Sequence, residues 1–298
     1  MKTFFYLTKR NIQVFFTDRG MLFTSMITPV ILLVLYSTFL ADNYKKGFEF
    51  LTQQFNASDE IINSIVSGQI VASLLAVCCV TVSFCSNVLI AQDKVKKVLE
   101  DFLVSPIKRS TLQLSYFVST WISTIIVNFI ALIACLIYVA CTGWFLSITD
   151  ILLLIVDILI LSAFGSAFSS AINFFLKTEG QISCVGTIVS AGYGFVCGAY
   201  FPLNQIPEGI KNVFMFLPGT YGTVLIKQHA LNGVMKELQN INIPEQVISE
   251  IQKSIDYKID FFSHGVPVWA LYLTIILGIV IFLGIYVIFS ILKKKKAN

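Results

Sequence analysis

Long apolar stretches separated by short polar clusters run through the whole chain. Six of them reach the length of about 20 residues that an α-helix needs to cross about 30 Å of hydrocarbon. They cover residues 21–41, 68–91, 112–141, 151–175, 181–201 and 266–292. Asp157 is the one Asp or Glu inside them, and no Lys, Arg or His falls there. The pattern predicts an all-α membrane protein with six transmembrane helices.

The segment that precedes the first span, residues 1–20, has a different pattern. Its apolar residues fall on one arc of a helical wheel, and Lys2, Lys9 and Arg10 fall on the other. This predicts a basic amphipathic helix that lies in the membrane interface, and an early start to the first span is the alternative. Charge mixed with the apolar residues, and no small-residue cleavage site, argue against a signal peptide.

Composition supports the membrane assignment. Of 298 residues 56% are hydrophobic and 13% charged, against about 45–50% and about 25% in ordinary globular proteins. So few charges exclude a soluble enzyme, a disordered chain and a nucleic-acid binder, and they leave membrane lipid as the expected surroundings. Seven cysteines lie inside apolar runs without a CxxC pair, so they are expected to pack as small apolar residues.

Basic residues predict the orientation of the chain in the membrane. Lys and Arg gather in the N-terminal segment, in the connection between the second and third spans, and in the tail at Lys293 to Lys296. The positive-inside rule therefore predicts that both termini are cytoplasmic, which an even number of spans allows. The expected location is the cytoplasmic membrane of a bacterium. Residues 202–265 would then form a small extracellular helical cap, with Val247, Ile248 and Ile251 at helical spacing after Pro244.

Motifs for chemistry are missing from the sequence. There is no GxxxxGK[ST], so the chain has no P-loop, and there is no HExxH. One carboxylate is too few for an aspartyl protease dyad. The chain is therefore expected to be no enzyme, with no catalytic residue, bound cofactor or metal ligand of its own.

The connection between the second and third spans carries the most specific pattern. Apolar residues recur at i, i+3, i+4, i+7 and i+8 in residues 93–105, which predicts a short amphipathic helix. They are Val95, Val98, Leu99, Phe102 and Leu103. Pro106 is expected to end this helix. The helix either lies in the interface or fits a groove on a cytoplasmic partner.

Two blocks of residues resemble a known family. Residues 100–106 (EDFLVSP) are similar to the E-x-L-L-x-S/T-P signature of the coupling helix in ABC-2 type ABC transporter permeases. Residues 198–207 (GAYFPLNQIP) and 217–221 (LPGTY) resemble the family's G-x-x-F-P-x-x-x-x-P and N/L-P-x-x-Y segments. The family often has Gly-Thr shortly before the coupling signature, where this chain has Lys97-Val98.

This resemblance implies a permease subunit that pairs with a second permease subunit, identical or different. Each would rest on a separate ATP-binding subunit, which would hold ATP and Mg. Docking is expected from the apolar side chains of the coupling helix, with charges setting the register and proline ending the helix. The expected ATPase-coupling residues are Lys96, Lys97, Val98, Leu99, Glu100, Phe102, Leu103, Ser105 and Pro106.

Small residues recur every four positions in the fifth predicted span. Such a ridge lets helices approach closely, either within one subunit or at a dimer seam that also lines the substrate path. Asp157 needs a partner at its depth in the membrane, and Asn128 is a possible hydrogen-bond partner. The expected residues of the substrate path or dimer seam are Asn128, Asp157, Gly186, Ser190, Tyr193, Gly194, Gly198 and Tyr200.

The function predicted from these features is export of an amphipathic or hydrophobic compound, such as a drug, an antimicrobial peptide or a lipid-like molecule. Export of a lipid-linked polysaccharide is the alternative within the family. A membrane scaffold without cargo and an intramembrane enzyme that uses Asp157 are the alternatives from other classes.

Overall fold

The apolar stretches form long helices in the computed structural model, which describes residues 2–105, 107–241, 243–262 and 264–295. Within these residues, five helical stretches are long and apolar enough to cross a membrane. They are Arg19–Phe55, Asp59–Val95, Arg109–Thr142, Ile148–Phe175 and Val268–Ser290. This arrangement agrees with the predicted all-α membrane class.

The stretch predicted as the fifth span does not belong to that set. It forms α9 (Glu179–Val196), a helix of 18 residues. Glu179, Gln181 and several Ser, Thr and Gly residues make it less apolar than the other spans. The chain then turns at Gly198, whose φ is 72°. The sixth crossing of the membrane therefore stays a prediction.

The helical stretch that contains the first predicted span, Arg19–Phe55, extends well beyond the apolar residues 21–41. After α1 (Lys2–Thr17), Asp18 caps α2 (Arg19–Leu35) by accepting hydrogen bonds from the N–H groups of Gly20 and Met21 at 2.9 and 3.2 Å. The helix continues through a π-helical turn, η1 (Tyr36–Leu40), into α3 (Ala41–Phe55). Much of the polar segment between the first two predicted spans is therefore helical.

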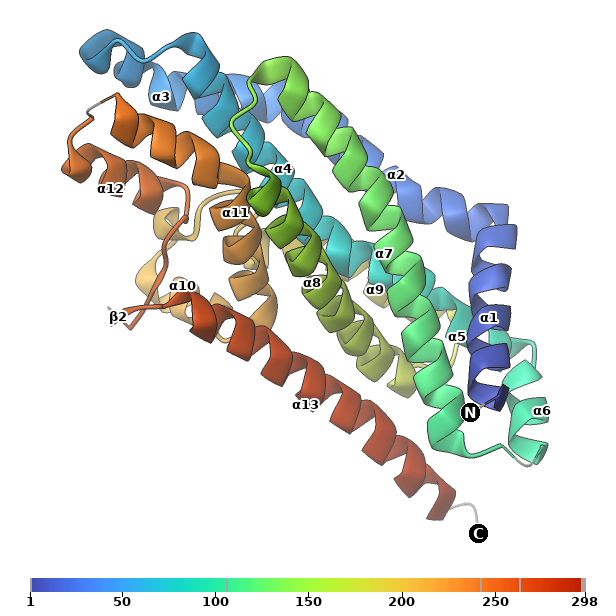
Figure 1. Ribbon diagram of the computed structural model, residues 1–298. Coiled ribbons are helices and arrows are strands. Elements are labelled where there is room, and N and C mark those ends of the chain that lie inside the picture. Colours follow the sequence, from blue (N-terminus) through green and yellow to red (C-terminus); the bar gives the residue numbers. More distant parts are fainter. Residues whose placement is uncertain (1, 106, 242, 263, 296–298) are drawn as a thin grey trace.

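Helix α4 (Asp59–Ser86) is the centre of the bundle. It packs against α2, α7 (Arg109–Thr142), α8 (Ile148–Phe175) and α11 (Pro218–Asn240), and nearly all of its side chains are buried. The chain continues through α5 (Val88–Val95) and α6 (Val98–Val104). Helix α13 (Val268–Lys295) packs mainly on α8. Figure 1 shows α1 beside α6 and α7, at the end of the bundle where both termini lie.

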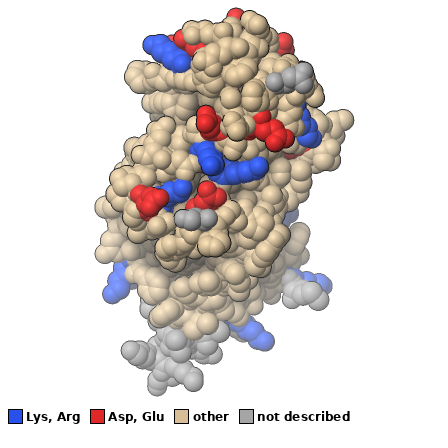
Figure 2. All heavy atoms as spheres, turned by 90° about the vertical axis from the view of Figure 1, so that its left-hand side faces the viewer, with Lys and Arg blue, Asp and Glu red and all other residues tan. Residues whose placement is uncertain are grey.

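The opposite end, which we call the cap end, holds the segment predicted as an extracellular cap. It contains η2 (Leu203–Gln205), α10 (Glu208–Phe214), α11, α12 (Glu245–Ser254), β1 (Asp260–Phe261) and β2 (His264–Gly265). Helix α11 is not a surface helix, because it packs between α4 and α8 and buries much of its length. Figure 2 shows acidic and basic side chains together over the cap, whereas the charged side chains visible at the other end are basic.

A buried ion pair holds the cap to the bundle. Lys227 of α11 is 0% exposed and Asp256, after α12, is 1% exposed, with Nζ and Oδ2 3.5 Å apart. The ammonium also donates to the Gly198 carbonyl at 2.9 Å. Asp256 accepts from the N–H of Leu203 at 2.5 Å. Burial lowers the pKa of Lys227, and the Asp256 charge opposes this shift. The pair therefore fixes the turn after α9 to both α11 and α12.

We expect Lys227→Met to lower the free energy of unfolding by about 3–5 kcal/mol, because the substitution leaves the buried Asp256 carboxylate without its cation. Thermal unfolding of the purified chain in detergent measures the loss. Lys258→Met is the matched control, since Lys258 is exposed close by in the same segment. Equal stability of the two variants would show that the ion pair does not hold the cap.

Candidate functional site

Arg10 of α1 joins four helices at the end of the bundle where the termini lie. Its guanidinium forms a bidentate pair with Asp93 of α5, at 2.5 Å for Nη1–Oδ2 and 3.0 Å for Nη2–Oδ1. Tyr116 of α7 donates its hydroxyl to the same carboxylate at 2.5 Å. The guanidinium carbon also lies 5.8 Å from the centroid of the Phe102 ring of α6. We call Arg10, Asp93, Tyr116 and Phe102 the Arg10 junction.

Burial explains why the junction needs all of these groups. Asp93 is 3% exposed, and a buried carboxylate is tolerated only when it is paired and hydrogen-bonded. The planar guanidinium meets both carboxylate oxygens and still presents a face to an aromatic ring. The hydrogen bond from Arg10 to Asp93 raises the pKa of Arg10, so the guanidinium stays charged. Because the charged Arg10 of α1 lies over the Phe102 ring of α6, a displacement of α6 would disturb this contact.

From the sequence alone, Arg10 is expected on the polar arc of an interfacial helix, without a contact to the bundle. The structure turns this side chain toward the bundle instead, so sequence reasoning missed the junction. One signal was present in the sequence. Asp93 lies two residues after the apolar stretch 68–91, and a carboxylate at that boundary needs a cation.

The helix predicted to couple to an ATPase is shorter than expected. Residues 93–105 do not form one helix, because α5 ends at Val95 and α6 begins at Val98. The N–H of Lys96 bonds to the Gln92 carbonyl and closes α5. Lys97 then adopts a left-handed conformation with φ of 60°. The family that the sequence resembles often has glycine at this position. Glycine reaches the left-handed conformation without strain.

The predicted ATPase-coupling residues lie on different sides of this short helix. Val98, Leu99 and Phe102 are half-buried, and Leu99 and Phe102 pack against the core of their own chain. Lys96 and Lys97 are exposed, and the Ser105 hydroxyl donates to the Phe102 carbonyl at 2.6 Å. The side chains of Glu100 and Leu103, and the whole of Pro106, lie outside the described residues. Among the described side chains of α6, the exposed apolar one is Val104, which is 90% exposed.

A groove of about 480 Å³ lies between α2, α9 and the junction of α4 with α5. Gly186 and Ser190, both predicted for the substrate path or dimer seam, line it. Residues with hydroxyl groups line it from both helices, namely Thr24, Thr28, Ser183, Thr187 and Ser190. Along α9 the buried residues are Ile182 and Gly194, and half of its residues are exposed, although the helix packs on α4 and α5.

The other residues on or after α9 that were predicted for the substrate path or dimer seam do not line this groove. They are Tyr193, Gly194, Gly198 and Tyr200. A Cβ at Gly194 would lie 2.2 Å from the ring of Tyr200, so glycine is needed there for packing within the chain. A Cβ at Gly219 would lie 2.2 Å from the Tyr193 hydroxyl oxygen, so this tyrosine packs closely against α11. Gly198 forms the turn after α9. Gly186 and Ser190 therefore line the groove, whereas Gly194 and Gly198 belong to the packed end of α9 and the turn after it.

Asp157 is paired with residues that the sequence analysis did not expect. Its carboxylate contacts His229 Nδ1 of α11 at 2.5 Å and accepts from the Tyr272 hydroxyl of α13 at 2.8 Å. The expected partner Asn128 instead donates to the Thr124 carbonyl at 2.9 Å, so that pairing is wrong. Asp157 holds α8, α11 and α13 together and does not line the groove. In the described part of the chain no cluster of His, Cys, Asp and Glu could hold a metal ion.

The fold and these contacts define an integral membrane protein with a short helix joined to its bundle through a charged junction. The family model of ABC-2 type transporters matches residues 2–228, and the chain belongs to this family. Members are transmembrane components that are generally not themselves catalytic. No curated protein sequence matches the chain.

We expect Lys97→Gly to stabilise the turn before α6 by about 1 kcal/mol, because a left-handed φ costs a residue with a Cβ about that much. Lys97→Val should destabilise it. Hydrogen exchange of the α6 amides measures both effects, as slower and faster exchange. Lys96→Gly is the matched control, since its φ of −76° gives glycine no advantage. Faster exchange in Lys97→Gly would contradict the strain at this position.

We expect Arg10→Met to lower the free energy of unfolding by about 3 kcal/mol, because it leaves the buried Asp93 carboxylate without its cation. Adding Asp93→Asn to that variant should recover part of the loss, since the unpaired charge disappears. Chemical unfolding in detergent compares both variants with Lys9→Met, which removes an exposed neighbouring charge. A double variant less stable than Arg10→Met would argue against a charge penalty at Asp93.

Proposed function

We propose that this chain is the membrane-spanning permease subunit of an ABC-2 type exporter. ATP would be hydrolysed by a separate P-loop subunit, and the chain would move an amphipathic or hydrophobic compound across the cytoplasmic membrane. The observation that carries this proposal is the placement of α6. A short helix with an exposed apolar tip is held against α1, α5 and α7 by the Arg10 junction.

The junction offers a route for mechanical coupling. A partner that grips α6 and shifts it would displace Phe102 beneath Arg10, and Arg10 is bound to Asp93 and Tyr116. Helices α1, α5 and α7 would then move with α6, because a packed and charged contact does not deform freely. The basic side chains at this end agree with a cytoplasmic position for the partner and for both termini.

The groove between α2 and α9 suits an amphipathic cargo. Hydroxyl groups share its lining with Ile27, Phe84 and Ile182, and Asp18 is the one charged side chain among the described residues that line it. Half of the residues of α9 are exposed, and α2 exposes Phe23, Ile31 and Val34. A second permease subunit placed against these two helices would close the groove and cover their apolar side chains. The same lining leaves a lipid-linked polysaccharide as the alternative cargo.

We expect Val104→Glu to reduce more than tenfold the amount of ATPase that co-purifies with the chain. A charge at the exposed apolar tip of α6 would have to be buried against the ATPase without a partner, at a cost of several kcal/mol. The assay uses co-expression of the chain with its partner P-loop ATPase subunit. Transport of a fluorescent amphipathic dye into inverted vesicles should fall with ATPase binding.

Ile148→Glu is the control for this experiment. Ile148 is 80% exposed and begins α8, on the far side of the bundle from α6. This variant should insert and bind the ATPase as the unmodified chain does. ATPase binding and transport that survive Val104→Glu would favour another docking site. A chain that binds the ATPase but transports neither an amphipathic compound nor a lipid-linked polysaccharide would favour the alternative of a membrane scaffold without cargo.

A further inference from the structure

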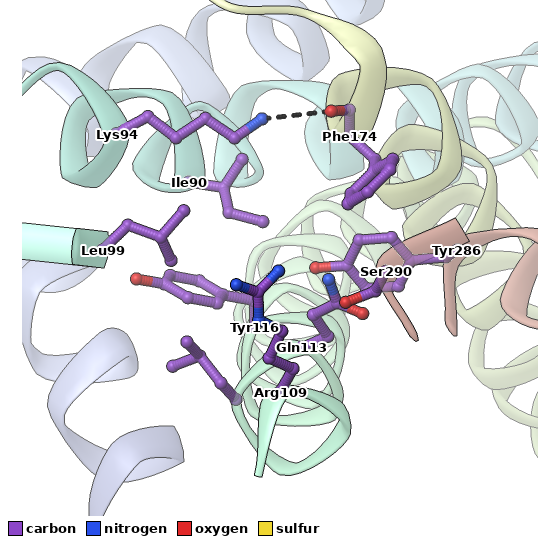
Figure 3. A pocket seen from close by; sticks show the side chains of 10 residues that line it. Ile90, Lys94, Leu99, Arg109, Gln113, Tyr116, Phe174, Tyr286 and Ser290 are labelled. Atoms are coloured by element: carbon purple, nitrogen blue, oxygen red, sulfur yellow. Dashed lines mark hydrogen bonds between the residues drawn. The ribbon is translucent and has the colours of Figure 1, made fainter. Parts of the chain in front are cut away.

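A second cavity lies behind α6, separate from the groove between α2 and α9. It encloses about 290 Å³ between α5, α6, the start of α7 and the ends of α8 and α13 (Figure 3). Its walls include Leu99, Arg109, Gln113, Phe174 and Tyr286. The proposed transport function makes no use of this space.

The cavity is positively charged. Arg109 is the first residue of α7, and the residue before it, Lys108, makes no side-chain cap for the helix. The positive end of the α7 dipole therefore opens at the cavity without a capping side chain. Lys94 lines it too, and its ammonium donates to the carbonyls of Asn173 and Leu176 at 2.9 and 3.0 Å. None of the described side chains that line it is acidic.

Two buried polar atoms in the cavity have no hydrogen-bond partner among the described residues. They are the hydroxyl of Tyr286, a residue that is 0% exposed, and Oε1 of Gln113. Figure 3 shows the Tyr286 hydroxyl directed into the cavity, on the side of Gln113 and Arg109. Buried polar groups are nearly always paired, so these atoms indicate a ligand with both an acceptor and a donor.

The cavity lies at the level where the apolar helices end. Arg109 starts α7, Phe174 is the penultimate residue of α8, and Ser290 lies near the end of the apolar stretch 266–292. Hydrocarbon gives way to lipid headgroups at such a level, and tyrosines such as Tyr116 and Tyr286 are typical of it. The volume is close to the lower limit of about 300 Å³ for ligand pockets, which suits a headgroup better than a large cargo.

We propose that this cavity binds the headgroup of an anionic membrane phospholipid. Arg109 pairs with the phosphate, and the Tyr286 hydroxyl donates to a phosphate oxygen. Oε1 of Gln113 accepts from a hydroxyl of the headgroup, as phosphatidylglycerol carries. Leu99 of α6 and Tyr116 of the Arg10 junction belong to the same walls, so a bound headgroup fills the space behind the coupling helix. The binding itself does not depend on the proposed transport function.

The test is a titration of the purified, delipidated full-length chain in detergent, followed by its melting temperature. The ligands are phosphatidylglycerol, phosphatidylcholine and water-soluble glycerol phosphate. Phosphatidylglycerol should raise the melting temperature at concentrations at least tenfold lower than the other two. Arg109→Gln should weaken its binding about tenfold or more, and Tyr286→Phe about three- to tenfold, as expected for hydrogen bonds to a charged group.

Lys108→Gln is the matched control, because it removes the same charge from an exposed neighbour that does not line the cavity. It should bind phosphatidylglycerol as the unmodified chain does. An equal loss in Lys108→Gln and Arg109→Gln would overturn the proposal in favour of general surface attraction. Glycerol phosphate that binds as tightly as the lipid would overturn it in favour of a soluble ligand. Should Arg109→Gln fail to fold, unchanged binding by Tyr286→Phe would overturn it.

Discussion

A carboxylate that is buried at the end of an apolar helix has to be paired, and the end of the bundle that holds the termini is organised around that requirement. Asp93 meets it with Arg10 and Tyr116, which come from the N-terminal helix and from the third apolar stretch. Because the guanidinium also lies over Phe102, the same contact positions α6. One buried charge therefore brings together three segments that are distant in the sequence.

The cap end follows the same physical rule with other residues. Lys227 and Asp256 are buried as a pair, and Asp157 is bound by His229 and Tyr272. Each pair joins elements that no continuous helix connects, and each would be costly to break from one side only. Between the two ends, α4 is buried along nearly its whole length, whereas α2, α9 and α13 each leave much of their surface uncovered. Because the outer helices are less covered than α4, they are free to contact lipid or a second subunit.

The groove and the cavity differ in the chemistry that they offer. Hydroxyl groups and apolar side chains line the groove between α2 and α9, with Asp18 as its one charge among the described residues. Arg109 and Lys94 line the cavity behind α6, together with Tyr286 and Gln113, each of which has a polar atom without a partner among the described residues. The groove suits a molecule that is uncharged over most of its length, and the cavity suits an anion held at one position. These differences agree with the proposed passage of cargo along the groove and with the proposed resident ligand in the cavity.

The sequence by itself determined that the chain is an all-α membrane protein, because apolar stretches of about 20 residues leave few other folds open to the backbone in lipid. It also placed the amphipathic helix at the N-terminus and a short helix near residue 100. Local backbone geometry decided where that short helix begins, because the left-handed Lys97 carries no sign in the hydrophobic pattern. Tertiary structure alone decided the partners of the buried charges. Arg10 and Asp93 are 83 residues apart, and Asp157 and His229 are 72 residues apart. Periodicity reports which face of a helix is buried, whereas these pairings depend on which helices pack together and at what depth.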